Sequence, residues 1–387
     1  MKKHLAAFAI ALALPLAGSL ATGCSSDDGG SLSGAAGGSS GDTGFGGEGG
    51  GSALTDDQYK QEAVDAMHDA LLTELETMAS ALEALQAAAP TPADRGWDAT
   101  LDAAAIAQMK TSWQQARTSY EHIEGALAPL FPDIDFSIDA RYDDFMTQLA
   151  PNGDPYLFDG TGVTGMHAVE RILYSDTTPA TVVKFESTLP GYVAARFPST
   201  AAEAADFKAE LCQKMVADAG ELISQWTPAN IDVAIAFQGL ISLMNEQREK
   251  VVKASGGEEE SRYSQRTMAD LRDNLSGSQA VYAIFEPWLR SKQSADPSLD
   301  GQSIDGVVLK GLGDLDAAYS AVSGDAIPAP PATWSAEDPS PADLMTPFGV
   351  LYSKVKAAVD PADPKSVVGE LDAAAKVLGF PEFNGGQ

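Results

Sequence analysis

The stretch Thr161–Asp176, TGVTGMHAVERILYSD, decides how the rest of the chain is interpreted. His167 and Glu170 lie three residues apart in it and therefore share one face of a helix. The helix itself is indicated by apolar residues that recur at three- and four-residue steps, namely Met166, Val169, Ile172 and Leu173. An imidazole and a carboxylate on one face can bind a metal ion or fix each other's protonation state. Because such pairs also arise by chance, this stretch alone leaves a purely structural role open.

Helical periodicity extends over almost the whole chain, and no segment shows the alternating pattern of a strand. Two capping boxes, Thr55 with Gln58 and Thr200 with Glu203, mark helix starts. We therefore predict an all-α protein, with an irregular proline-rich segment at 327–341. The helices are expected at about 55–88, 102–127, within 133–150, around His167, after Pro179, and at about 200–226, 227–254, 264–290, 307–323, 341–359 and 364–378.

A faint internal repeat suggests how these helices are grouped. The pattern Tyr-x-x-apolar-Glu-x-x-Leu occurs at 120–127 and again at 282–289. The offset is close to half of the folded region, so we expect two packed four-helix-bundle-like halves, approximately 55–226 and 227–387.

The N-terminus has the pattern of an exported protein. Lys2 and Lys3 precede an apolar run that is too short and too interrupted for a transmembrane helix, so residues 1–23 are expected to be a signal peptide. The sequence LATGC ending at Cys24 resembles a bacterial lipobox, whose cysteine becomes lipidated. Residues 24–54 would then form a flexible Gly/Ser-rich linker. We expect a periplasmic protein of the bacterial cell envelope, anchored to a membrane by lipid, with the outer membrane favoured by Ser25 and Ser26.

Composition excludes some partners and a disulfide framework. The chain has 25 basic and 55 acidic residues, a net charge of −30, which argues against nucleic acid as a partner. Its two cysteines are Cys24 and Cys212. If Cys24 carries lipid, Cys212 has no intramolecular partner and is expected to be a small buried side chain.

Further carboxylates accompany the His167 pair. Glu121 and Glu124 lie three apart in a predicted helix, and Asp139 follows a proline-broken turn. The acidic end of the 227–254 helix and the residues after it, up to Glu260, add Glu246, Glu249, Glu258 and Glu259. Carboxylates and His/Glu pairs on facing helices build metal sites in bundles, and one imidazole among carboxylates suits Fe, Mn or Zn. Equally, these acids could be solvated surface charges, and Asp139 could pair with Arg141 or cap a helix.

Three strings, FPDIDFSIDARYDD, GMHAVE and GGEEESRYSQRTMADLRDNL, together resemble the imelysin-like family. The resemblance is strongest to its EfeM/EfeO branch of lipoproteins from iron uptake systems, and it runs from about Thr55 to at least Leu289. It implies an all-helical fold with a metal site formed by the residues that match the family motifs: Glu121, Glu124, Asp139, His167 and Glu170. A further ligand would come from Glu249, with Glu246 or a loop glutamate as the alternative. The implied metal is iron, with zinc possible, and the implied partner is an inner-membrane iron permease.

Three functions follow from this sequence. The first is a metal-binding lipoprotein that captures metal for an uptake system. The second is an imelysin-like metallopeptidase, which is disfavoured because the chain has no HExxH motif and few histidines. The third is a non-enzymatic envelope binder of a polysaccharide or a protein partner. The negative charge disfavours a polyanion unless a bound cation bridges it.

Overall fold

The computed structural model describes residues 54–381. The predicted signal peptide, the lipidation site Cys24 and the linker up to residue 53 lie outside the described residues. Within 54–381 the regular secondary structure is entirely helical, which confirms the all-α prediction. None of the described helices has the length and apolar character needed to cross a membrane.

The first two helices are the longest. Helix α1 (Asp56–Ala88) begins with the expected capping box, in which the Thr55 hydroxyl accepts from the Gln58 N–H at 3.3 Å. Helix α2 (Ala103–Leu130) continues past Pro129, where the sequence predicted its end. Pro129 lies in the last turn, so its missing N–H removes only one helical hydrogen bond there.

The remaining helices follow in the order of the chain. They are α3 (Pro132–Asp139), α4 (Tyr142–Leu149), α5 (Gly165–Leu173), α6 (Ala180–Glu186), α7 (Ala201–Asp206), the π-helical turn η1 (Phe207–Leu211), α8 (Cys212–Gln225), the short 3₁₀ turn η2 (Pro228–Asn230), α9 (Val233–Lys253), α10 (Thr267–Arg290), α11 (Gly301–Ser320), the 3₁₀ turn η3 (Asp343–Met345), α12 (Pro347–Val359) and α13 (Val367–Leu378).

Four predicted helix starts were wrong. Helix α11 begins at Gly301 rather than near residue 307, and α12 begins at Pro347 rather than near residue 341. The other two starts were wrong for identifiable reasons. Helix α9 begins at Val233 rather than at Thr227, because the Asp232 carboxylate caps it by accepting the N–H of Ala234 at 2.9 Å. Helix α10 begins at Thr267 rather than at Ser264, whose backbone N–H donates to a side chain of another helix. Segment 327–341 is irregular, as expected.

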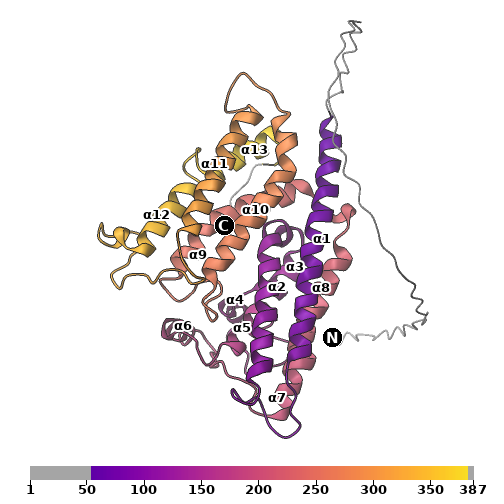
Figure 1. Cartoon of the computed structure of the whole chain (residues 1–387), viewed down its shortest axis with the longest axis vertical. Coiled ribbons are helices and arrows are strands. Elements are labelled where there is room, and N and C mark those ends of the chain that lie inside the picture. The colour runs from indigo at the N-terminus through magenta and orange to yellow at the C-terminus, as the bar shows by residue number, and fades with distance from the viewer. Residues whose placement is uncertain (1–53, 382–387) are drawn as a thin grey trace, which may run out of the picture. The chain divides into compact units, whose positions relative to one another are not determined.

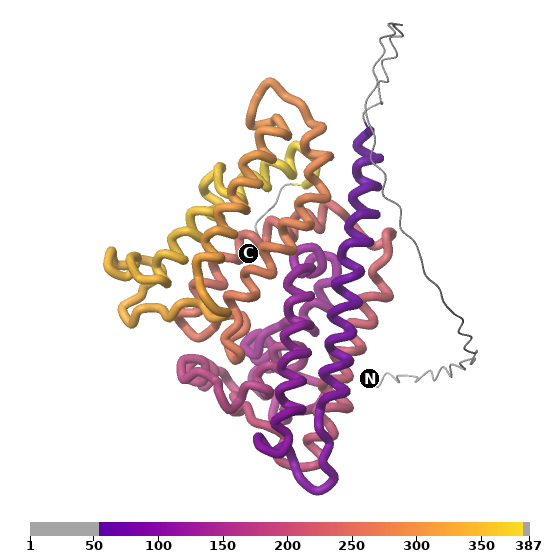
Figure 2. The backbone as a smooth tube through the Cα atoms, viewed as in Figure 1, coloured from indigo at the N-terminus to yellow at the C-terminus, as the bar shows by residue number. Residues whose placement is uncertain are grey.

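Helix α2 is the central element of the packing. It lies against α1 on one side and against α9 and α10 on the other, and α8 covers α1 (Figure 1). The backbones approach closely where glycines face α2: a Cβ at Gly277 of α10 would lie 2.1 Å from the His122 carbonyl oxygen. Helices α11, α12 and α13 pack on α9 and α10 and complete the C-terminal group, as the tube in Figure 2 shows.

The repeated tyrosines occupy related environments. Tyr120 and Tyr282 are both fully buried, and each donates its hydroxyl to a carboxylate, Asp135 for the first and Asp305 for the second. The described residues, 54–381, belong to one compact unit, in which α2 packs against helices of both sequence halves. The division near residue 226 therefore stays a prediction. Cys212 is buried and free, as expected.

Candidate metal centre

A glycine brings the His167 helix against the end of α3. Gly165, the first residue of α5, has φ +83°, a conformation that favours glycine. A Cβ at this position would lie 2.5 Å from the carbonyl oxygen of Ile138. The close approach places His167, in the first turn of α5, beside Asp139 at the end of α3.

The His167 ring is buried, and a hydrogen bond at Nδ1 fixes its orientation. Its Nδ1 lies 2.9 Å from Oε2 of Glu170, and because a carboxylate only accepts, Nδ1 carries the hydrogen. Its Nε2 faces Oδ1 of Asp139 at 3.4 Å and Oε1 of Glu260 at 3.6 Å. Nε2 has no hydrogen-bond partner within the described structure. Buried polar atoms without partners are rare, so this nitrogen is a candidate metal ligand.

One atom each of Asp139, His167 and Glu260 lies within 4.8 Å of the other two. Two carboxylate oxygens and one imidazole nitrogen form a donor set that suits Fe, Mn or Zn. Glu260 is the member that sequence reasoning did not single out. The acidic run before Arg262 is evident in the sequence, but only the fold of the α9–α10 loop (residues 254–266) shows which glutamate points inward.

The charge of each of the three residues depends on the charges of its neighbours. Burial and the nearby Arg117 both disfavour a charged imidazole, yet Asp139, Glu170 and Glu260 together raise the pKa of His167 to about 10. Burial also opposes ionisation of Asp139, but Arg117 and His167 hold its pKa below the usual value. Without a cation His167 is therefore protonated, and a metal ion would replace its Nε2 proton.

Two buried cations neutralise the surrounding acids. The Arg117 guanidinium forms ion pairs with Glu121, with Asp139 and, at 3.3 Å, with Glu260. The Lys250 ammonium lies 3.4 Å from Oε2 of Glu260. Burial opposes the ionisation of Glu260. Nevertheless, Lys250, His167 and the nearby arginines keep the pKa of Glu260 well below its usual value. Asp139 and Glu260 are thus anionic at neutral pH and suited to bind a cation.

The predicted α2 glutamates lie beside this centre and do share a helix face. Glu121 is fully buried, pairs with Arg117 and accepts from the Asn274 amide. Glu124 accepts from Lys250 at 3.2 Å and from Asn274 at 2.7 Å. Both are connected to Glu260 through the buried cations, and within the described part of the chain neither forms a hydrogen bond or ion pair with the imidazole.

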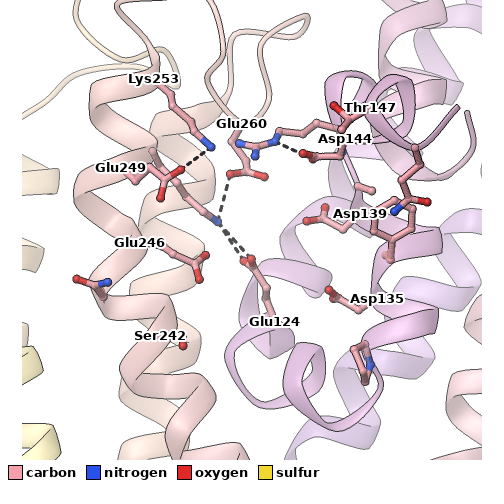
Figure 3. A pocket seen from close by; sticks show the side chains of 17 residues that line it. Glu124, Asp135, Asp139, Asp144, Thr147, Ser242, Glu246, Glu249, Lys253 and Glu260 are labelled. Atoms are coloured by element: carbon pink, nitrogen blue, oxygen red, sulfur yellow. Dashed lines mark hydrogen bonds and ion pairs between the residues drawn. The ribbon is translucent and has the colours of Figure 1, made fainter. Parts of the chain in front are cut away.

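The structure does not bring Glu249 or Glu246 to the imidazole. Both lie on α9, in the wall opposite Asp139 of a cavity of about 690 Å³ (Figure 3). The Glu249 side chain is 58% exposed and pairs with Lys253 at 2.5 Å.

This cavity, which we call the acidic cavity, is bordered by Asp139 and Glu260 of the centre. Its charged lining residues are Glu124, Asp135, Asp139, Asp144, Glu246, Glu249 and Glu260, against Arg141, Lys250 and Lys253. The excess of carboxylates attracts cations.

These features define an all-helical protein with a buried carboxylate–histidine centre that borders an acidic cavity. The family model described as imelysin, Peptidase_M75, matches residues 64–318. The chain therefore belongs to the imelysin family, and the resemblance seen in its sequence motifs is confirmed.

Curated relatives match part of the chain. The proteins named "Iron uptake system component EfeO" from Escherichia coli K12 and from Shigella flexneri are each 30% identical over 194 residues. The match covers 50% of this chain and 40% of either relative, so it spans less than half the length of those proteins.

A solved structure supports the fold. That of an imelysin-like protein from Psychrobacter arcticum 273-4 superposes with a TM-score of 0.54 and 12% identity. The alignment covers 85% of this chain and 98% of that chain, and it shows that the two share the imelysin-like helical fold.

Proposed function

We propose that this protein is a metal-binding lipoprotein of the bacterial cell envelope that captures iron for an uptake system. The observation that carries the proposal is the convergence of Nε2 of His167 with oxygens of Asp139 and Glu260 inside one buried cluster. The name of the EfeO relatives, iron uptake system component, supports iron as the cargo. Zinc would fit the same donor set.

The acidic cavity supplies a route to this cluster. Asp139 and Glu260 belong both to its lining and to the ligand group. A hydrated cation entering the cavity meets carboxylates on both walls, with α9 on one side and α3 and α4 on the other (Figure 3). Carboxylate exchange along these walls would let the cation lose water stepwise before it reaches the imidazole.

The proposed setting follows from the N-terminal sequence and the relatives. Lipidation at Cys24 would tether the helical domain to the envelope on the 24–54 linker, with the outer membrane favoured. From the periplasm the protein would pass its metal to an inner-membrane iron permease. Glu121, Glu124 and Glu170, which the family motifs imply as ligands, would then support the three-residue centre, and the geometry favours Glu260 over the exposed Glu249 as the additional oxygen ligand.

Equilibrium dialysis of the purified protein against Fe²⁺ and Zn²⁺, with casein hydrolysis assayed on the same samples, tests the function. Capture predicts about one bound metal ion per chain and no hydrolysis, since a capture site needs no open catalytic position. Metal-dependent hydrolysis that His167→Ala removes would favour the metallopeptidase alternative. Absence of bound metal would overturn both.

A further inference from the structure

Glu170 is buried completely, and both of its carboxylate oxygens are already engaged. Oε2 accepts from Nδ1 of His167 at 2.9 Å. Oε1 accepts the backbone N–H of Tyr263 at 3.2 Å and that of Ser264 at 2.8 Å. One side chain therefore contacts both the imidazole of the centre and the α9–α10 loop, which carries Glu260.

The α9–α10 loop is anchored to the N-terminal helices at several further points. Its Tyr263 hydroxyl donates to the buried Glu186 of α6, and its Arg262 pairs with Asp143 of α4 at 2.9 Å. Gly257 has φ +79°, and a Cβ there would lie 2.8 Å from the backbone of Thr181. Of these contacts, the one from Glu170 also reaches the imidazole.

The geometry points to Glu170 as a positioning residue that assembles the metal centre without binding the metal itself. It orients His167 so that Nε2 faces the metal position, and it fixes the loop so that Glu260 reaches that same position. The inference rests on the proposed function for the metal, but the docking of the loop does not depend on it.

The alternative, in which Glu170 is itself a ligand, has a structural cost. The candidate ligand atoms gather around Nε2 of His167, whereas Glu170 contacts Nδ1. To reach a metal at Nε2, the carboxylate would have to give up Nδ1 or the two loop amides. Each abandoned donor would then be buried without a partner, which is unfavourable.

Replacement of Glu170 by glutamine separates these roles. A carboxylate accepts on both sides, whereas an amide accepts on one side and donates on the other. In Glu170→Gln the NH₂ group must face either Nδ1–H of the imidazole or the loop N–H groups. We expect the loop to loosen, or the imidazole to reorient, while the packed helices stay intact.

The test is hydrogen exchange measured by mass spectrometry on the full chain after metal removal. Loop peptides covering 256–266 should exchange about tenfold faster in Glu170→Gln, the factor that loss of one such hydrogen bond predicts, or the His167 Nδ1–H resonance should change. Glu249→Gln removes an exposed glutamate of the same cavity and should change neither. Loop exchange and a His167 resonance identical to wild type, with metal binding lost, would overturn the inference and make Glu170 a ligand.

A second measurement keeps the inference testable if Glu170→Gln does not fold. In the wild-type protein, added Zn²⁺ should leave the Tyr263 and Ser264 amides as protected as before, or protect them further. Faster exchange of these amides on zinc binding would show that Glu170 leaves them for the metal. If wild type binds neither Zn²⁺ nor Fe²⁺, the proposed function fails, while the metal-free comparison of wild type with Glu170→Gln still decides whether Glu170 holds the loop.

Discussion

Oε1 of Glu260 lies 3.6 Å from Nε2 of His167, although four α-helices separate the two residues along the chain. Glu260 belongs to a loop without regular secondary structure, and His167 to a short helix. Arg117 and Lys250 also contact Glu260, at 3.3 Å and 3.4 Å. Arg117 and Lys250 thus already place two positive charges beside Glu260, and a bound metal ion would add a further positive charge there.

The first prediction concerns the imidazole. His167→Ala should bind no metal tightly and should keep its helical content, because the apolar residues of α5, not the imidazole, pack the helix into the core. Metal stoichiometry and circular dichroism check this. His122→Ala, which removes a partly exposed histidine of α2, should bind metal like wild type. Equal stoichiometry in wild type and His167→Ala would refute the site.

The second prediction separates the loop glutamate from the α9 glutamate. Glu260→Gln should weaken metal binding at least about 100-fold, because removal of residues outside the ligand set already costs 10–100-fold in metal sites. Glu249→Gln should leave the affinity within about threefold, since its exposed carboxylate acts only through screened charge. Competition titration with a chelating dye measures both. The reverse order would place the metal on the α9 wall.

The third prediction concerns Lys250. Its ammonium lies within 3.9 Å of carboxylate oxygens of Glu121, Glu124 and Glu260, so Lys250→Met removes a buried positive charge that these three acids share. The metal-free variant should lose about 3 kcal/mol in free energy of unfolding. Added metal should then raise its melting temperature more than it raises that of wild type. A metal-free variant as stable as wild type would contradict this account of the charge balance.

The fourth prediction concerns pH. Burial and the negative charge of Asp139 raise the pKa of Asp135 to about 8, although the Tyr120 hydroxyl opposes this. The folded state therefore retains a proton that the unfolded state has lost, and the stability from Asp135 is lost as pH rises from about 4 through 8.

Urea unfolding of the metal-free protein at pH 5.5 and 8.5 checks this for wild type and Asp135→Asn. Because Asp135 is partly exposed, wild type should lose roughly 2 kcal/mol more than the variant over this interval. The same pH dependence in both proteins would show that Asp135 ionises normally.

The fifth prediction concerns the contact between α5 and α3. Gly165→Ala should cost about 2–4 kcal/mol, because the new Cβ meets the Ile138 carbonyl and φ is positive. Metal affinity should fall as well, since the clash moves His167 away from Asp139. Gly220→Ala is the control: no atom lies within 4 Å of its Cβ, and alanine favours the helix. Thermal unfolding with metal titration compares them.

Much of the fold could be predicted because its signals are local. Apolar periodicity and capping residues such as Thr55 are read from neighbouring positions. They located α1 correctly and predicted that the other long helices exist, although several of their ends were displaced. The start of α10 could not be read in this way. Ser264 donates its N–H to Glu170, far away in the sequence, so local propensity did not decide that boundary.

The candidate site shows the same limit. The helical spacing of His167 and Glu170 correctly placed both side chains on one face, within hydrogen-bonding distance. Spacing could not show that the second carboxylate oxygen of Glu170 accepts hydrogen bonds from the α9–α10 loop, or that Glu249 faces solvent beside Lys253. Glu260 could not be predicted as a ligand, because a glutamate in an acidic loop is usually solvated. It is buried only because the loop packs against the N-terminal helices.

The most direct test of the central claim is anomalous diffraction at the iron edge from crystals of the iron-loaded protein. The account predicts one strong peak within bonding distance of Nε2 of His167 and of carboxylate oxygens of Asp139 and Glu260. A peak on the Glu246 and Glu249 wall, or no ordered iron near His167, would contradict it.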